Sequence, residues 1–441
     1  MNWKTNNLGM FIGSNRWVFF ILFIAVIIRL SLVVATGDVK SVKGDSASYD
    51  DYAINILENE SWLVDADFKS HFSPPGYPLF LSAVYKVFGK RNHQAVFFIQ
   101  ALLNLIMLMY IYRFSREISD EKAAFLSLAW SSVYILYLYF MPMLLRETLI
   151  CLLLLLFFYY LYRLLIEVPL KKYFIGIIIL FTLLIHTDPR YLFYVPFLSV
   201  LFIFYSPSYR IGIRKYCIFV ASILILMTPW TIRNYFAYDG LVIINTRTYD
   251  SRAAEQIRLE WSHIKNQNYI LSEVYPTEEE REQVKKGLNP NNRTLVELEA
   301  IKQDKRAAKD IKSKLLFNFI GFWKPVRFWS GYRNYPDGRF FGSWSLEHNV
   351  SSMIGFGLLL PCMIFHVVYS IYKRKLIVLY LTFPLIVHTI LHVILSGRER
   401  YRVHVDSFVL ILGTMGIVTL FEIIRKNRKT SVIFETRRFN G

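Results

Sequence analysis

The chain has 441 residues, of which 54% are hydrophobic and only 19% are charged. Soluble globular proteins carry about 25% charged residues, so this composition excludes a soluble enzyme, a disordered tail and a disulfide scaffold. The formal net charge of +18 would suggest nucleic acid in a soluble protein. Lysines and arginines that flank membrane spans explain it better. We therefore expect a polytopic membrane protein with no nucleic-acid partner.

The chain contains about ten apolar segments, several of which reach the ~20 residues that a helix needs to cross the hydrocarbon core. The first segment lacks a small-residue cleavage site, which favours a retained span over a signal peptide. The fifth and sixth are short and broken at Asp188-Pro189, so a helical hairpin that crosses only partly is an alternative to two spans. The predicted spans lie near 17–35, 95–113, 123–141, 148–163, 173–187, 190–206, 216–235, 350–372, 376–396 and 403–424.

Basic residues collect in the short loops on one side of these spans, for example at Lys171-Lys172 and at Lys373-Arg374-Lys375. By the positive-inside rule this side is cytoplasmic and holds both termini. The predicted organisation has four parts. These are an N-terminal transmembrane module (1–235) that includes the outer loop 36–94, a large extracytoplasmic loop (236–349), C-terminal transmembrane helices (350–424) and a basic cytoplasmic tail (425–441).

The first outer loop is predicted to contain two helices that lie along the membrane surface. From Asp45 onward, apolar and aromatic residues recur at helical spacing as far as Leu57. The turn Pro74-Pro75-Gly76 then opens a second short apolar helix, which is expected to end at Gly89. The fold class is therefore an all-α polytopic membrane protein with juxtamembrane helices in its first outer loop.

Ionisable residues at a membrane edge are costly, so their placement is informative. The unusual ones fall on the predicted outer side, on five separate chain segments, and three arginines crowd one short link. Guanidinium groups bind phosphate oxygens bidentately, which predicts a lipid phosphate at this edge. The residues are Asp45, Asp50 and Asp51; Arg146 and Glu147; His186, Asp188 and Arg190; Arg233; and Arg398, Arg400 and Arg402.

Each residue also has a purely structural interpretation. Asp45 fits an N-cap, and Glu147 fits a partner for Arg146 or a charge that stabilises a helix start. Arg233 and Arg402 fit anchors at the membrane interface. His388 and His392 are four residues apart, a spacing compatible with a metal pair, although hydrogen-bonded core histidines explain them better. These interpretations do not explain why the residues gather on one side.

The order of the motifs resembles the polyprenyl-phosphate-sugar-dependent glycosyltransferases of clan C, in particular the branch similar to protein O-mannosyltransferases and lipid A aminoarabinose transferases. The likeness covers most of residues 15–424. Glu147 also occupies the family's acidic position before the fourth span. The stretches that carry the resemblance are Gly44-Asp45-Ser46-Ala47-Ser48-Tyr49, Pro74-Pro75-Gly76-Tyr77-Pro78-Leu79, Pro229-Trp230-Thr231-Ile232-Arg233-Asn234 and Arg400-Tyr401-Arg402.

The resemblance implies transfer of a sugar from a polyprenyl-phosphate donor to a hydroxyl or similar acceptor, with inversion, at the extracytoplasmic face of a bacterial plasma membrane. Asp45 would be the general base, and Glu147 would orient the acceptor or tune Asp45. The donor phosphate would be bound by arginines, and the remaining predicted residues would contact substrate. The arginines are Arg190, Arg233, Arg400 and Arg402, and the substrate contacts are Tyr49, Tyr77, Asp50 and His186.

Partners implied by the resemblance are the lipid-linked sugar, membrane lipids and a lipid, glycan or protein acceptor. No metal ligand is assigned, although some relatives use a divalent metal and that alternative stays open. Three other functions also stay open. A lipid-linked sugar transporter or flippase would share the phosphate site, an O-antigen-type polymerase or ligase would use a pyrophosphate donor, and a non-catalytic scaffold would need neither.

Overall fold

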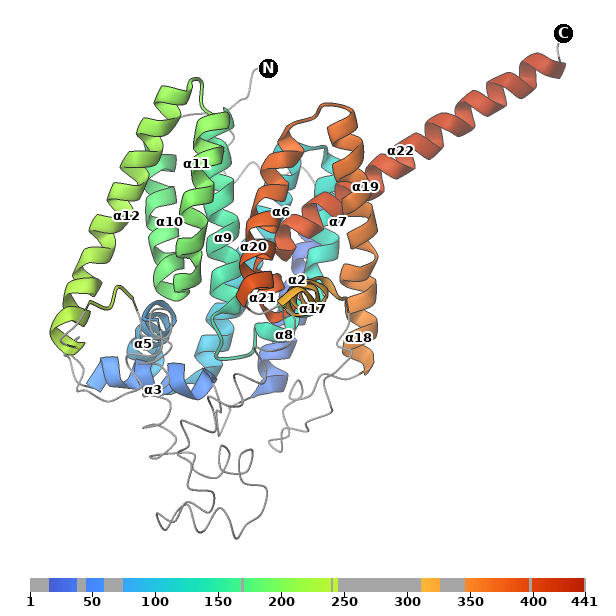
Figure 1. Cartoon of the computed structure of the whole chain (residues 1–441). Helices are drawn as coiled ribbons and strands as arrows, with labels where there is room; N and C mark the ends of the chain where they lie inside the picture. The colour runs from blue at the N-terminus through green and yellow to red at the C-terminus, as the bar shows by residue number, and fades with distance from the viewer. Residues whose placement is uncertain are drawn as a thin grey trace.

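The computed structural model describes residues 16–37, 45–58, 74–167, 170–238, 241–244, 311–325, 346–395 and 399–439. All the regular elements in these ranges are helices. They form an upright bundle that is crossed at one end by short helices (Figure 1). The predicted all-helical architecture is therefore confirmed for the part of the chain that is described.

Seven helical segments of the described chain are long and apolar enough to span a membrane. All seven correspond to predicted spans. They are α2 (Arg16–Thr36), α6 (His93–Ile118), α9 with η1 (Glu147–Tyr162 and Arg163–Glu167), α12 (Tyr209–Tyr238), α18 to α19 through η4 (Leu346–Ser352, Met353–Gly357 and Leu359–Tyr372), α20 (Ile377–Leu395) and α22 (Asp406–Phe439) with the short elements that precede it.

The other three predicted spans are helical but shorter. The third divides into α7 (Glu121–Ser132) and α8 (Ile135–Phe140), where Ser132 turns its hydroxyl back onto the carbonyl of Ala129, a bond that competes with helix propagation. The fifth is α10 (Lys171–Thr187), and the sixth comprises η2 (Pro189–Phe193) and α11 (Tyr194–Phe204). Pro189 separates them because it lacks a backbone N–H. The total of ten spans thus stays a prediction.

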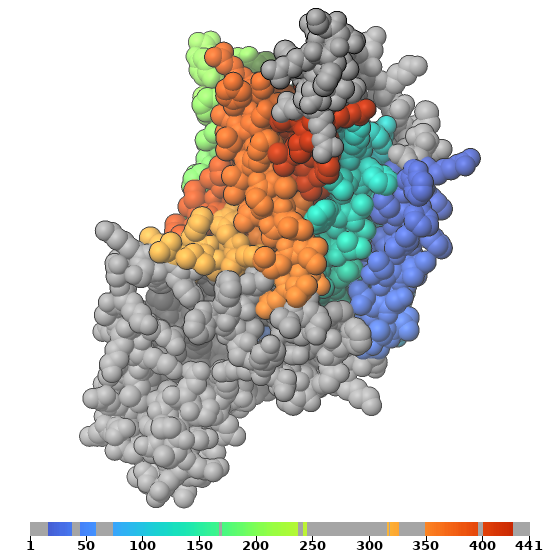
Figure 2. Space-filling view, turned by 90° about the vertical axis from the view of Figure 1, so that its right-hand side faces the viewer, coloured from blue at the N-terminus to red at the C-terminus, as the bar shows by residue number. Residues whose placement is uncertain are grey.

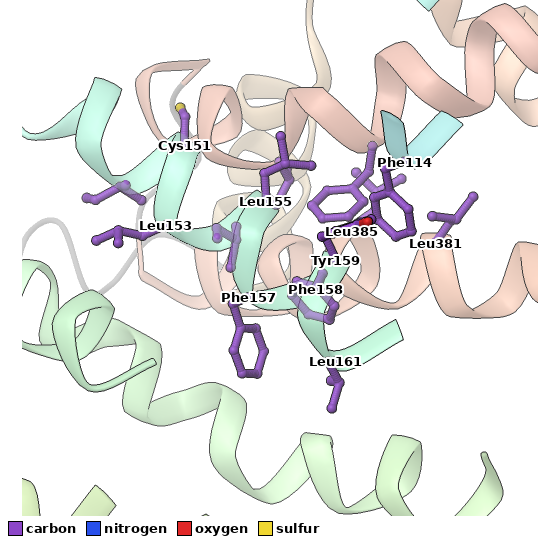
Figure 3. Close-up of a cluster of buried hydrophobic side chains, with 14 of the residues drawn as sticks. Phe114, Cys151, Leu153, Leu155, Phe157, Phe158, Tyr159, Leu161, Leu381 and Leu385 are labelled. Atoms are coloured by element: carbon purple, nitrogen blue, oxygen red, sulfur yellow. The ribbon is translucent and has the colours of Figure 1, made fainter. Parts of the chain in front are cut away.

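Helix α9 lies at the centre of the bundle, between α10–α12 on one side and the C-terminal helices on the other (Figure 1). It is apolar on all faces, and 72% of the residues in its most apolar stretch are buried. A helix that is hydrophobic all round belongs in a core. Its side chains pack against residues far away in the sequence, including Phe114, Leu381 and Leu385 (Figure 3). This packing fixes where the first residue of α9, Glu147, lies relative to the other helices.

Helices α3 (Asp45–Glu58) and α5 (Gly76–Phe88) confirm the two helices predicted in the first outer loop. Gly89 follows α5 with a φ of 101°, a left-handed conformation that glycine adopts without strain. Gly76 permits a close approach of α5 to the end of α10, because a Cβ at Gly76 would lie 2.5 Å from Thr187 Oγ1. The sequence Pro-Pro-Gly therefore sets the entry of α5 against the end of a span.

The large loop at 236–349 lies mostly outside the described residues. Its described part includes α17 (Ile311–Trp323), which packs against α20 and lies across the foot of the C-terminal helices (Figure 2). Phe322 of α17 is buried and stacks on His392. These contacts attach the described part of the large loop to the C-terminal helices.

A charged residue also lies within a span. Arg29 of α2 is fully buried. Its guanidinium donates to Asn104 Oδ1 at 2.9 Å and to the carbonyls of Ala25 and Ser132. These bonds offset part of the cost of burying an ionised side chain, while Nη2 has no hydrogen-bond partner among the described residues. This arginine therefore ties α2 to α6 and α7.

Candidate active site

Arg400 bridges two carboxylates at the end of the bundle. It belongs to α21 (Glu399–Arg402), a four-residue helix that precedes the last span. Its Nη1 donates to Asp45 Oδ2 at 2.8 Å, and its Nε donates to Glu147 Oε1. Charge-assisted hydrogen bonds of this kind are among the strongest in proteins. Three segments that are distant in the sequence therefore meet at one guanidinium.

The two carboxylates differ in exposure. The Asp45 side chain is 42% exposed and that of Glu147 is 2% exposed. Glu147 is the first residue of α9, where the partial positive charge of the helix start favours a carboxylate. Its predicted pairing with Arg146 is replaced by the pairing with Arg400. Its second oxygen, Oε2, is buried and accepts no hydrogen bond from the described residues.

A second cluster of charged residues, centred on Asp188, lies beside the cluster of Asp45, Glu147 and Arg400. Asp188 follows α10 and pairs with Arg146 at 3.3 Å and with Arg190, whose Nε lies 2.9 Å from Asp188 Oδ1. Burial alone would raise the pKa of Asp188, but the charges of Arg146 and Arg190 outweigh it and lower this pKa well below its ordinary value. Arg190 also lies over the ring of Tyr401, 4.2 Å from its centroid. Because Arg146 precedes Glu147 and Tyr401 follows Arg400, the two groups are adjacent.

Two histidines of α20 contact Tyr401. His388 Nε2 donates to the Tyr401 carbonyl at 2.9 Å, and His388 Nδ1 lies 2.9 Å from the hydroxyl of Tyr194. The ring of His392 stacks on that of Tyr401 at 4.7 Å between centroids. Both nitrogens of His388 are thus used in hydrogen bonds, which favours the core-histidine interpretation over a metal pair. No group of three metal-ligating side chains lies among the described residues.

Tyr49 and Tyr77 lie together near this site. Their rings meet edge to face at 5.2 Å, and both are buried. Burial raises the pKa of Tyr49 above its ordinary value, so its hydroxyl stays protonated. Tyr77 donates to Gln100 Oε1 at 2.9 Å, a residue that sequence reasoning missed because a single glutamine within an apolar span gives no motif. Their predicted contact with the sugar stays a prediction.

Asp50 and His186 form hydrogen bonds with residues other than those of the Arg400 site. Asp50 is fully buried and accepts from the Tyr85 hydroxyl at 2.6 Å and from Arg91 Nη1 at 2.8 Å, with His93 Nε2 at 3.2 Å. These contacts fasten α3 to α5 and to the start of α6, which favours a structural role. His186 Nδ1 donates to the carbonyl of Thr182 at 2.8 Å, within its own helix. For both residues, substrate contact stays a prediction.

Two of the predicted phosphate-binding arginines have partners outside the Arg400 site. Arg402 is fully buried; it donates to Asp406 Oδ1 at 3.1 Å and to the Lys324 carbonyl at 2.8 Å, and it lies 3.5 Å from the ring centroid of Phe356. Arg233 donates to its neighbour Asn234 and lies over the Trp230 ring. Four of the five predicted segments therefore meet, namely those of Asp45, Glu147, Asp188 and Arg400.

Comparisons with known proteins agree with this architecture. Residues 73–232 match the family model described as dolichyl-phosphate-mannose-protein mannosyltransferase. A search of curated protein sequences finds no match.

Among solved structures, the apo oligosaccharyltransferase of Archaeoglobus fulgidus aligns with a TM-score of 0.55 and 15% identity, over 96% of this chain and 52% of that one. The same archaeal protein, AglB, in complex with an inhibitory peptide and dolichol-phosphate aligns with a TM-score of 0.55 and 14% identity, over 95% and 52%. ArnT from Cupriavidus metallidurans bound to undecaprenyl phosphate gives a TM-score of 0.42 and 11% identity, over 92% and 78%.

At such identities the archaeal likeness shows the fold alone, and this chain spans about half the length of the archaeal protein. The family match covers the segment that includes Tyr77, Arg146, Glu147, Asp188 and Arg190. The resemblance found in the sequence motifs is confirmed. Residues 73–232 therefore resemble the dolichyl-phosphate-mannose-protein mannosyltransferases, and the described chain shares its fold with the archaeal oligosaccharyltransferase.

Proposed function

We propose that this protein is a membrane glycosyltransferase that moves a sugar from a polyprenyl-phosphate donor to an acceptor hydroxyl at the extracytoplasmic face. The single observation that carries the proposal is the bridge made by Arg400 between Asp45 and Glu147. It combines a group able to accept a proton with a cation able to bind phosphate, at the end of a bundle whose apolar helices offer a path for a lipid tail.

The two carboxylates differ in solvent exposure, and we assign them different roles on that basis. Asp45, at 42% exposed, is accessible to an acceptor, and we assign it as the general base. Glu147, at 2% exposed, acts instead by holding Arg400 in place. Its unpartnered Oε2 supports a functional site, since a buried acceptor without a partner is rare and usually has a functional reason.

The arrangement of charge also explains how donor binding prepares the base. Arg400 neutralises Asp45 in this structure, and a carboxylate paired with a guanidinium is a weak base. A donor phosphate at this position competes with Asp45 for the same N–H groups. Once Arg400 turns to the phosphate, its charge stabilises the Asp45 carboxylate less, so the carboxylate becomes more basic. Donor binding therefore precedes proton removal from the acceptor.

The reaction then follows as one displacement. Asp45 takes the proton of the acceptor hydroxyl, whose oxygen forms a bond to the anomeric carbon of the sugar. The bond between that carbon and the phosphate oxygen breaks, and its electron pair leaves with the polyprenyl phosphate. Arg400, with Arg190 beside it, neutralises the charge that develops there. Preorganised charge is often the largest contribution to catalysis. A single displacement inverts the anomeric configuration.

The direct test uses the purified protein in lipid vesicles with polyprenyl-phosphate-linked sugars labelled in the sugar. Production of free polyprenyl phosphate together with a labelled acceptor supports the proposal. Label that crosses the bilayer with the phosphate–sugar bond intact supports a flippase instead. Transfer only from a pyrophosphate-linked donor supports a polymerase or ligase. Comparison of envelope glycans, lipids and secreted proteins with and without the gene identifies the acceptor.

A further inference from the structure

Gln100 is a fully buried amide that joins three elements. It lies in α6 with 0% exposure. Its Oε1 accepts the hydroxyl of Tyr77 at 2.9 Å, and its Nε2 donates to the carbonyls of Met141 at 2.6 Å and Met143 at 2.8 Å. The amide orientation is unambiguous, because both carbonyl partners only accept hydrogen bonds.

The two carbonyls that Gln100 holds lie in the link between α8 and α9. This link ends at Arg146, and Glu147 begins the next helix. The link forms a tight turn in which Leu145 N–H donates to the Met143 carbonyl at 2.8 Å. At its end, Arg146 donates to the Thr187 carbonyl at 3.0 Å. A shift of the link at Met143 would therefore move the carboxylate that orients Arg400.

We infer that Gln100 is a positioning residue for catalysis, which acts through the 141–146 link and Glu147 on Arg400. This inference rests on the proposed function. It also explains why an amide occurs at this position of an otherwise apolar helix. The cost of burying it is offset only if all its groups are bonded. Those bonds hold the backbone of the 141–146 link at two of its carbonyls.

Asn104 offers a matched control on the same face of α6, four residues further along. It is also buried, and it accepts a hydrogen bond from Arg29 Nε at 2.9 Å, away from the 141–146 link. Gln100→Leu and Asn104→Leu both remove a buried amide from one helix. Both are expected to lower thermal stability, since each leaves partners without a bond. Only Gln100→Leu is expected to change catalysis.

For Gln100→Leu we expect kcat to fall at least about tenfold while the KM for the lipid donor stays within about twofold. A misplaced Arg400 would weaken stabilisation of the transition state more than binding of the donor, and such a change lowers kcat. Asn104→Leu is expected to keep kcat within about threefold. Adding Gln100→Leu to Glu147→Gln is expected to cause little further loss, since residues that act as a unit are not additive. Fully additive losses would contradict the inference.

Hydrogen–deuterium exchange provides a readout that is independent of activity. Amides of residues 141–147 are expected to exchange faster in Gln100→Leu than in Asn104→Leu or the unmodified protein. Unchanged exchange there would overturn the inference. Faster exchange in a protein that transfers no sugar would leave the positioning intact and contradict the proposed function instead.

If Gln100→Leu does not fold, Gln100→Glu keeps the size and the acceptor for Tyr77 but loses both N–H donors. Its kcat relative to the unmodified protein is expected to rise toward acidic pH, where a protonated carboxylic acid donates one hydrogen bond. A ratio that does not vary with pH would contradict the inference.

Discussion

Asp45 and Arg400 are 355 residues apart in the chain, and their side chains pair at 2.8 Å. Arg400 reaches Glu147 with a different nitrogen of the same guanidinium. This geometry needs a planar, forked cation, since a single ammonium has no fixed pair of donors. The bridge depends on the packing of α9 at the centre of the bundle and on the position of α21 against α20.

Asp45→Asn is expected to reduce sugar transfer at least about 10²-fold, because general-base catalysis contributes about 10²–10⁴-fold. The protein should remain folded and membrane-inserted, since this side chain is 42% exposed. Asp51→Asn on the same helix is the control, as Asp51 pairs with Arg91 away from the site. Single-turnover transfer by the purified variants measures the effect. Equal transfer by both variants would exclude Asp45 as the base.

Arg400→Lys is expected to lower transfer at least about tenfold, because a lysine does not reproduce the bridge between Asp45 and Glu147. Glu147→Gln should cause a similar loss. The double variant should be little worse than either single variant, since both changes break one unit. Initial rates at saturating donor measure the three variants. A double variant whose loss equals the product of the single losses would contradict the shared role.

Arg402→Ala is expected to destabilise the protein, in contrast to a residue that only binds donor at the interface. Arg402 and Asp406 are both fully buried, and removing one partner of a buried pair costs about 3–5 kcal/mol. Replacing both, as in Arg402→Met with Asp406→Leu, should recover much of the stability. Thermal unfolding in detergent tests this. A stable Arg402→Ala variant with weakened donor binding would restore the original prediction for this residue.

Asp188→Asn is expected to lower the unfolding midpoint, and the size of that effect should depend on pH. Arg146 and Arg190 lower the pKa of folded Asp188 despite its burial, while the unfolded value is about 3.9. The pairing therefore contributes fully above about pH 5, and this contribution is lost as pH falls through the lower folded pKa. The difference from the unmodified protein should be constant from about pH 5 to 8 and shrink below about pH 4. A difference that grows on acidification would contradict this account.

Chelation of divalent metal is expected to leave transfer unchanged. Arg400 supplies the positive charge between Asp45 and Glu147, in the position that a divalent ion would share with two carboxylates. Transfer is measured after EDTA treatment, with and without added Mg²⁺ or Mn²⁺. Activity that is lost with EDTA and restored by one of these ions would show that a metal takes part.

Much of the framework follows from the sequence alone. Seven apolar stretches become long helices because a bilayer requires every backbone group to be bonded within its own segment. The two helices in the first outer loop follow from periodicity and from Gly89. The motifs that carry the family resemblance also single out Asp45, Glu147 and Arg400 as candidate site residues.

Only the tertiary structure decided which charged residues act together. Sequence position gives the depth of a residue along a helix, but its partner depends on how neighbouring helices are rotated and packed. Arg400 and Arg402 are two residues apart, yet α21 turns the first toward Asp45 and the second toward Asp406 and the end of α17. Gln100 and Asp50 became interpretable in the same way. A buried polar residue shows its purpose only through the groups that satisfy it, and those groups come from other helices.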